Sequence, residues 1–361
     1  MSSILDSADK IKEIDQHNLL GSVLALPDQI QDAWDATKSL SFPESFHDIS
    51  NIIVSGMGGS SLGALVIKRL FKDELQVPLE IYPHYELPGY ASKNSLVVLS
   101  SYSGSTEETL AAADQAKQIG AKIVVITSGD KLLELAKINN WPHYLIDPKF
   151  NPCNQPRMAI GYAVVGMLSI FNKMGLINIS EAEVLKIVDN LKETVAQLSP
   201  GGSVDLAKHM AYSVFDKHIV LVAAEHLIGA AHVMNNQLNE NAKTLTSEWH
   251  LPEFNHHYME ALSYPKLAKE TTIFVFINSA LYHPRVQKRV LLTKNLVEQK
   301  GFETQMILAT RESKLEQVFE VIQFAEFVAA YLPVLYGIDA SAIPNVDWFK
   351  QEMADLQGQA L

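Results

Sequence analysis

A cluster of hydroxyl side chains at residues 100–106, Ser-Ser-Tyr-Ser-Gly-Ser-Thr, is the strongest chemical signal in the sequence. It lies between an apolar, strand-like run (Ser95–Leu99) and an Ala- and Glu-rich stretch (Thr106–Ile119) that favours a helix. The first turn of a helix has unpaired N–H groups and a partial positive charge, and neighbouring hydroxyls add donors for phosphate oxygens. The alternative is that these residues only cap the helix, because Ser and Thr are common N-caps. We predict a phosphate site formed by Ser101, Ser103, Ser105 and Thr106.

A glycine-rich loop at residues 56–63, Gly-Met-Gly-Gly-Ser-Ser-Leu-Gly, follows the β-rich run Asn51–Ser55. It does not match a dinucleotide-binding fingerprint, because Ser61 occupies the third glycine position and no acidic residue clearly ends the next strand. It is not a Walker loop either, since no Gly-Lys-Ser or Gly-Lys-Thr closes it. These departures disfavour an NAD enzyme. The loop instead indicates close approach of its backbone to a ligand at Gly58 and Gly59, with Ser60 as a further donor.

The elements that must position these loops alternate between strand-like and helical segments, which predicts parallel sheets covered by helices on both faces. A capping box at Ser180 begins a helix that ends before the break Ser199–Ser203. We therefore predict an N-terminal helical arm at 1–45, a phosphate-binding α/β domain at 46–200, and a second α/β domain with C-terminal helices at 201–361. The other predicted elements are strands at Leu79–Tyr82, Lys122–Thr127, His218–Ala223, Thr272–Ile277 and Phe302–Leu308, and helices at Ser61–Phe71, from Gly229 onward, and at Val286–Gln299.

The composition excludes several classes of function. The 29 Lys and Arg against 41 Asp and Glu give a formal net charge of -12, without the basic face that nucleic-acid binding needs. The single Cys153 excludes an intrachain disulfide and a cysteine-rich metal site, and it fits a reducing cytoplasm. The first residues lack the pattern of a secretory signal. Met158–Phe171 is too short to span a membrane and polar residues interrupt Phe319–Ile338, so we expect two buried helices.

The two loops together, Gly-Met-Gly-Gly-Ser at 56–60 and Ser-Tyr-Ser-Gly-Ser-Thr-Glu-Glu-Thr at 101–109, resemble those of the sugar-isomerase (SIS) domain. More closely, the chain is similar over nearly its whole length to the bifunctional phosphoglucose/phosphomannose isomerases, which carry two such domains in tandem. This resemblance implies two doubly wound α-β-α sandwiches. It also implies an isomerase that interconverts glucose 6-phosphate and fructose 6-phosphate through a cis-enediolate, with no metal or other cofactor. The expected ligand is a small sugar phosphate and the expected assembly is a homodimer.

Four residues match catalytic positions of that family. Glu240, in Asn-Glu-Asn at 239–241, matches the base that moves a proton between C2 and C1, and Arg157, after Pro156, matches the cation that stabilises the enediolate. His256, in Leu-Pro-Glu-Phe-Asn-His at 251–256, and Lys350 match the residues that open the sugar ring. The resemblance further implies that His256 serves the site of the partner subunit.

Residue types alone leave other roles open at these positions. Glu240 and Lys350 could be solvated charges, and Arg157 could belong to a structural ion pair, because an unpaired buried charge is costly. His256 lies near His250, His257 and Glu260, but their spacing matches no known zinc pattern, so we predict no metal site.

The sequence leaves the substrate specificity open. The family has a Thr shortly before its C-terminal lysine, whereas this chain has Ser341 or Ile343 in that region, which leaves mannose 6-phosphate open as a second substrate. Another SIS chemistry, on amino-sugar or heptose phosphates, would keep the same serine loop. A non-catalytic sugar-phosphate sensor would also keep it, but the presence of all four catalytic matches favours an enzyme.

Overall fold

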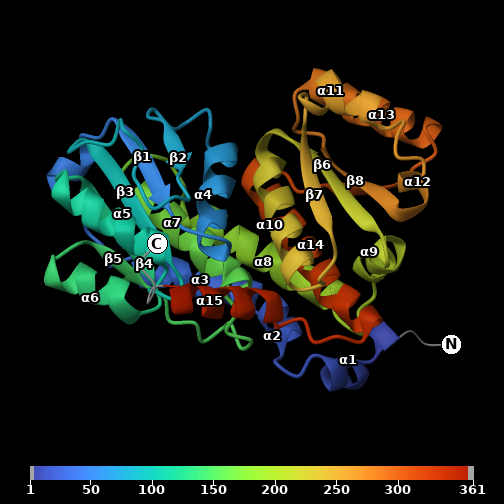
Figure 1. The fold of residues 1–361 in the computed structure, drawn as a ribbon, viewed down its shortest axis with the longest axis horizontal. Coiled ribbons are helices and arrows are strands. Elements are labelled where there is room, and N and C mark those ends of the chain that lie inside the picture. The colour runs from blue at the N-terminus through green and yellow to red at the C-terminus, as the bar shows by residue number, and fades with distance from the viewer. Residues whose placement is uncertain (1–3, 357–361) are drawn as a thin grey trace.

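The computed structural model describes residues 4–356 and contains two parallel β-sheets, one of five strands and one of four (Figure 1). The first sheet lies between residues 51 and 145 and the second between 218 and 309, and helices cover both faces of each. The predicted fold class, tandem doubly wound α/β sandwiches, is confirmed.

The five strands of the first sheet have the spatial order β2-β1-β3-β4-β5. They are β1 (Asn51–Ser55), β2 (Leu79–Ile81), β3 (Ser95–Ser101), β4 (Lys122–Thr127) and β5 (His143–Leu145), and the helices packed on them are α4 (Gly59–Leu70), α5 (Glu107–Gln118), α6 (Asp130–Ile138) and α7 (Ile160–Lys173). Alternate side chains of β3 point to opposite faces, so Val97 and Leu99 pack with α5 and α6 while Leu96 and Val98 join the larger core. This double burial explains why β3 is apolar without interruption.

The strand order reverses between β1 and β3, because β1 leads to β2 on one side while β3 leads to β4 on the other. At such a point the loops after the two strands diverge and leave a crevice at the carboxyl edge of the sheet, where α/β proteins usually bind ligands. The glycine loop follows β1 and the hydroxyl loop follows β3. The fold therefore brings both predicted ligand loops to this one edge.

The four strands of the second sheet have the order β7-β6-β8-β9. They are β6 (His218–Ala224), β7 (Thr246–Leu251), β8 (Thr272–Ser279) and β9 (Glu303–Ala309), and the helices of this domain are α9 (Leu206–Val214), α10 (Ile228–Glu240), α11 (Phe254–Ala261), α12 (Ala268–Thr271), α13 (Pro284–Gln299) and α14 (Lys314–Tyr336). Helices α10 and α14 lie on the side that faces the first domain (Figure 1).

Helix α10 packs directly against α4 and so joins the two domains. A Cβ atom on Gly229 would lie 2.6 Å from the Cα of Val66, so only glycine permits this approach. The contact matters for the site because α4 begins at the glycine loop and α10 ends at Glu240.

Both apolar stretches form buried helices, as predicted. Every residue from Ile160 to Phe171 in α7 is buried. Helix α14 is long and apolar enough to cross a membrane, but 83% of its most apolar window is buried inside the protein. Two of its polar residues have hydrogen-bond partners: the buried Gln323 donates to the carbonyl of Val23 (3.0 Å), and the half-exposed Glu320 accepts from the backbone N–H of Thr310 (2.8 Å).

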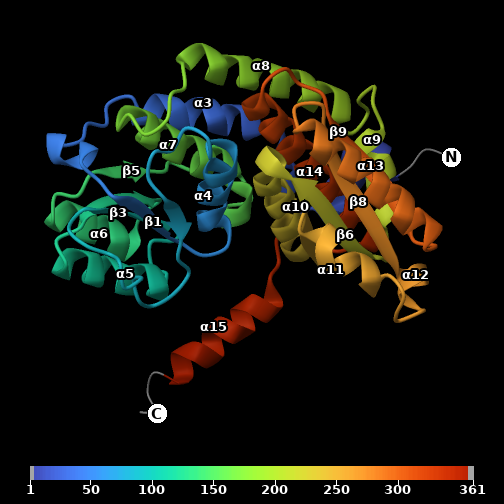
Figure 2. The same ribbon diagram turned by 90° about the horizontal axis from the view of Figure 1, so that it is seen from above.

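The remaining helices lie outside the two sheets and the helices packed on them. They are α1 (Ala8–Ile14), α2 (Leu19–Leu24), α3 (Leu26–Thr37), α8 (Glu181–Leu198) and α15 (Pro344–Leu356). The capping box predicted at Ser180 is present, since its side chain accepts from the Glu183 N–H while the Glu183 side chain accepts from the Ser180 N–H. Helix α15 extends away from the body of the molecule (Figure 2), and Trp348 and Phe349 on it are 63% and 57% exposed.

Most predicted elements match the observed ones to within a few residues, and Lys122–Thr127 coincides with β4. The edge strands β5 and β7 were not predicted. A strand at the edge of a sheet is only partly buried, and β7, Thr-Ser-Glu-Trp-His-Leu, accordingly lacks a continuous apolar run.

Candidate active site

The hydroxyl loop after β3 forms a compact cluster at the N-terminus of α5. The hydroxyl oxygens of Ser101 and Thr106 are 2.8 Å apart, and Ser101 Oγ lies 3.4 Å from Ser103 Oγ and accepts from the Gly104 N–H (3.0 Å). Ser105 is exposed and its N–H donates to Ser103 Oγ at 3.4 Å. Thr106 occupies the N-cap position, yet its side chain makes no capping hydrogen bond. Capping therefore does not account for Thr106, whose hydroxyl joins the other hydroxyls instead.

The glycine loop after β1 packs tightly against the hydroxyl loop. Ser60 Oγ accepts from the Tyr102 N–H (2.9 Å), while Ser100 Oγ donates to the Ser60 carbonyl (2.8 Å). Gly58 is the N-cap of α4 and has a left-handed φ of 49°. The loops are thus held together at the N-termini of two helices, α4 and α5, where the positive end of each helix dipole favours an anion.

Gly59 connects this cradle to the segment that carries Arg157. A Cβ atom on Gly59 would lie 2.9 Å from both the Arg157 nitrogen and the Pro156 carbonyl oxygen, so a side chain there would push the two segments apart. Pro156 also lines a small cavity together with Gly59 and Ser60. The predicted phosphate loops and the predicted cation are therefore neighbours in the fold.

We expect Thr106→Val to weaken binding of a phosphorylated ligand without unfolding the protein. The substitution keeps the shape of the side chain but removes one hydroxyl of the cradle, and a hydrogen bond to a charged group contributes about 1.5–3 kcal/mol, so KM should rise about 10- to 100-fold. The matched control is Thr109→Val in the same helix, because Thr109 is buried and its Oγ1 has no hydrogen-bond partner among the described residues. Steady-state kinetics of the two variants test this, and equal KM values would contradict it.

Arg157 is almost completely buried, at 1% exposed, and its guanidinium is surrounded by acceptors. Nη2 donates to the carbonyls of Ala340 (3.0 Å) and Ser341 (3.1 Å), Nη1 donates to Gln155 Oε1 (2.9 Å), and Nε donates to Asn241 Oδ1. Burial lowers the pKa of Arg157 from its ordinary value, while the nearby Glu240 carboxylate opposes this effect. The many acceptors hold the guanidinium plane in one orientation.

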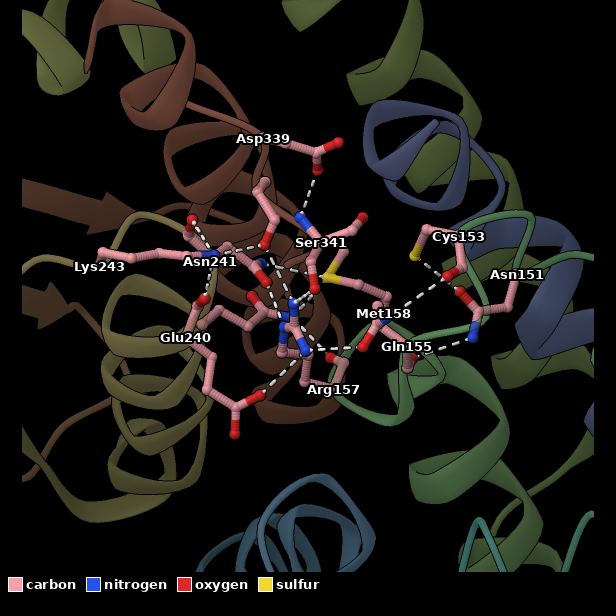
Figure 3. Close-up of polar contacts among 12 residues, drawn as sticks. Asn151, Cys153, Gln155, Arg157, Met158, Glu240, Asn241, Lys243, Asp339 and Ser341 are labelled. Atoms are coloured by element: carbon pink, nitrogen blue, oxygen red, sulfur yellow. Dashed lines mark hydrogen bonds and ion pairs between the residues drawn. The ribbon is translucent and has the colours of Figure 1, made fainter. Parts of the chain in front are cut away.

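Glu240 is the last residue of α10 and pairs with Arg157, with 3.2 Å between Oε2 and Nη1 (Figure 3). The Glu240 side chain is 38% exposed, so it combines a buried cationic partner with access from solvent. The structural ion pair considered for Arg157 therefore exists, and its partner is the residue predicted to be the base. A carboxylate and a fixed guanidinium side by side can remove a proton and stabilise the negative charge that results.

The structure does not bring His256 or Lys350 to this pair. His256 is exposed on α11, at the far end of the second domain in Figure 1, and Lys350 is exposed on α15. Among the described residues, no hydrogen bond or ion pair joins either one to Glu240 or Arg157. The two residues meet the site only if another molecule or a movement of the chain brings them there.

Sequence reasoning missed several residues that surround the ion pair. Asn241 and the carbonyls of Ala340 and Ser341 bind Arg157, and the Lys243 ammonium donates to the carbonyls of Glu240 (2.8 Å) and Ala340 (2.8 Å). Asn241 follows Glu240 directly in the Asn-Glu-Asn motif, so its position beside the predicted base could have indicated a role in the site. Nothing local in the sequence links Ala340 to Arg157.

The corresponding crevice of the second sheet is filled by side chains. His226 Nε2 and Ser279 Oγ both contact Gln317 Oε1, at 3.0 and 2.6 Å, and the hydroxyl of Tyr282 accepts from the Ala224 N–H (3.3 Å). All these groups are buried. This crevice thus offers no hydroxyl cradle of the kind found in the first domain. Within residues 4–356, no three His, Cys, Asp or Glu side chains are grouped so that they could hold a metal ion.

Known proteins resemble the chain in sequence and in fold. Residues 45–139 match the model of the SIS domain and residues 203–353 match that of the "Bacterial phospho-glucose isomerase C-terminal SIS domain". A bifunctional phosphoglucose/phosphomannose isomerase from Caldicellulosiruptor bescii is 30% identical over 343 residues, which cover 93% of this chain and 99% of the relative. A D-glucosamine-6-phosphate 4-epimerase from Sulfolobus acidocaldarius is 30% identical over 58% of this chain and 62% of its own length. The solved tagatose-6-phosphate ketose/aldose isomerase from Escherichia coli shares the fold, with a TM-score of 0.66 and 17% identity over 92% of this chain and 95% of that one.

Proposed function

Because the chain belongs to the bifunctional phosphoglucose/phosphomannose isomerase family, we propose that it interconverts glucose 6-phosphate and fructose 6-phosphate. The observation that carries this proposal is the Arg157–Glu240 pair, 3.2 Å apart, whose Arg157 backbone adjoins the hydroxyl-lined cradle at Gly59. A phosphate held by the cradle would tether the sugar so that its carbonyl end reaches the pair.

In this mechanism the Glu240 carboxylate takes the proton from C2 of the open-chain aldose. The electron pair of the C–H bond forms the C1–C2 double bond of the cis-enediolate, and the negative charge collects on O1. Arg157 stabilises this charge, since its buried guanidinium needs no reorganisation when the charge develops. The hydroxyl proton passes from O2 to O1, and Glu240 returns its proton to C1 to give the ketose. These steps use only protein side chains, so a chelator should leave the rate unchanged.

Ring opening requires an acid and a base, and we assign these roles to His256 and Lys350 with His256 supplied by the partner subunit of a homodimer. The position of His256 supports this assignment, because it is exposed on α11 and makes no hydrogen bond or ion pair with Glu240 of its own chain. Lys350 lies on α15, which follows directly after the Ala340–Ser341 segment bound to Arg157. We also place the protein in the cytoplasm, in keeping with the buried free Cys153.

Mixing two inactive variants tests the shared site. In a heterodimer of Glu240→Gln and His256→Ala, one site combines the intact Glu240 of one subunit with the intact His256 of the other. If each site uses the partner's histidine, an equal mixture refolded together should regain about a quarter of wild-type activity, since half the dimers are mixed and one of their two sites is intact. If His256 acts within its own chain, no site is intact and the mixture stays inactive.

The substrate assignment is tested with the purified protein and a panel of sugar phosphates. Glucose 6-phosphate should give fructose 6-phosphate in a coupled assay, with and without chelator. Mannose 6-phosphate is included because Ser341, which is 3% exposed, contacts Arg157 only through its carbonyl, and its Oγ has no hydrogen-bond partner among the described residues. That hydroxyl could serve either C2 epimer. Conversion of an amino-sugar phosphate in place of glucose 6-phosphate would refute the proposal.

A further inference from the structure

Lys243 lies three residues after Glu240 and uses its ammonium to hold backbone carbonyls together (Figure 3). Nζ donates to the carbonyls of Glu240 (2.8 Å), Asn241 (3.2 Å) and Ala340 (2.8 Å). An ammonium has three N–H bonds, so a carbonyl accepts each of them. Since the carbonyls at the end of a helix lack intrahelical partners, Lys243 satisfies the end of α10 and ties it to the Asp339–Ser341 segment.

Arg157 binds the same carbonyl, because Ala340 O also accepts from Nη2 at 3.0 Å. Two cationic side chains therefore meet at one oxygen, and their mutual repulsion is offset by the carboxylates of Glu240 and Asp339. The backbone of Lys243 is left-handed, with a φ of 52°, which residues other than glycine seldom adopt. Such strain and crowding of like charges concentrate at functional sites, where the surrounding structure maintains them.

We propose that Lys243 is a positioning residue of the isomerase: it clamps the end of α10 to the Ala340 carbonyl and so fixes the Glu240 carboxylate relative to the Arg157 guanidinium. Without the clamp, the last turn of α10 would be free to fray, and Glu240 would move relative to both Arg157 and the substrate. The phosphate cradle belongs to the first domain, and among the described residues none of its side chains forms a hydrogen bond with Lys243. The role rests on the proposed function and predicts an effect on turnover instead of on substrate binding.

The surroundings of Lys243 lower the pKa of its ammonium group. Burial and the neighbouring Arg157 lower its pKa to about 8, while Glu240 and Asp339 act in the opposite direction. Asp339 is itself paired with His17, with 2.6 Å between Oδ2 and Nδ1. A neutral amine has two N–H bonds and cannot serve three carbonyls. Turnover by the wild type should therefore decline as the pH rises through about 8.

The test compares Lys243→Met, Lys243→Arg and the wild type in kcat, KM and Tm. Methionine keeps the length of the side chain without donors, and small displacements of catalytic groups cost up to about 100-fold, so kcat should fall about 10- to 100-fold while KM stays within about 3-fold. Arginine stays charged throughout, so the wild-type decline near pH 8 should be absent from this variant. The matched control is Lys173→Met, since Lys173 also donates to a backbone carbonyl, that of Lys38 (2.8 Å), but lies away from the site.

Each outcome has a distinct meaning. The proposal is supported if kcat falls in Lys243→Met while its Tm matches that of Lys173→Met and the pH dependence disappears in Lys243→Arg. If the wild type is active and Lys243→Met keeps the wild-type kcat, with or without a lower Tm, the positioning role alone is refuted. A wild type without isomerase activity would refute the proposed function and this role together.

Discussion

Replacing Glu240 by glutamine should leave a folded protein that binds sugar phosphates but isomerises them about 10²–10⁴-fold more slowly, the usual contribution of a general base. Glutamine has the same size and can still accept a hydrogen bond from Arg157, but its amide cannot take a proton from C2. The Glu240 side chain is 38% exposed at the end of α10, so the change removes little buried structure. The measurements are kcat from a coupled assay and the Kd of fructose 6-phosphate from calorimetry.

The control for this variant is Glu270→Gln, an equivalent change at an exposed position on α12. It should keep wild-type kcat, which shows that losing one acidic charge from the second domain does not by itself slow the reaction. If Glu240→Gln turns over at nearly the wild-type rate, the proton is moved by another group and the base assignment is wrong. If instead binding is lost while kcat at saturation is normal, Glu240 acts only in holding the substrate.

Replacing Arg157 by lysine should reduce kcat about 10²–10³-fold, the cost of removing a pre-positioned group that stabilises developing charge. Lysine retains the charge, but it lacks the planar fork of five N–H donors. In the wild type that fork binds Gln155, Asn241 and the carbonyls of Ala340 and Ser341 while it faces Glu240. An ammonium cannot satisfy all of these buried acceptors, so Tm should also fall.

The loss of rate must be separated from the loss of stability. Kinetics are therefore measured well below the Tm of the variant, together with its Kd for fructose 6-phosphate. Arg311→Lys is the matched control, because the Arg311 guanidinium also binds two partners, with Nη1 donating to Asn190 Oδ1 (3.2 Å) and Nη2 paired with Glu193 (3.3 Å). Among the described residues, it makes no hydrogen bond or ion pair with Glu240 or with the substrate loops. A kcat for Arg157→Lys within about threefold of the wild type would show that the guanidinium has a structural role and does not stabilise the enediolate.

Local sequence patterns predicted the parts of the fold that depend on near neighbours. The capping box at Ser180 and Glu183 needs only residues three apart, and β4 needs only a short apolar run between a helix and a turn. Strand β7 was not predicted because its four central residues are only half-buried and it lacks a continuous apolar run, and β5 was not predicted because it has only three residues. Likewise, Thr106 was predicted to open a helix, but only the fold shows its hydroxyl turned to Ser101 instead of capping α5.

By itself, the sequence determined which residues could do the chemistry: the hydroxyl and glycine loops, and Glu240 and Arg157 as candidates within their motifs. The tertiary structure decided which of them meet. Arg157 lies 84 residues from Asn241 and 183 from Ala340 along the chain, and no local pattern specifies such distant contacts. They form because α10 packs on α4 at Gly229, which brings the end of one helix and the start of the other to the same crevice, and because burial then requires acceptors for every donor of the guanidinium.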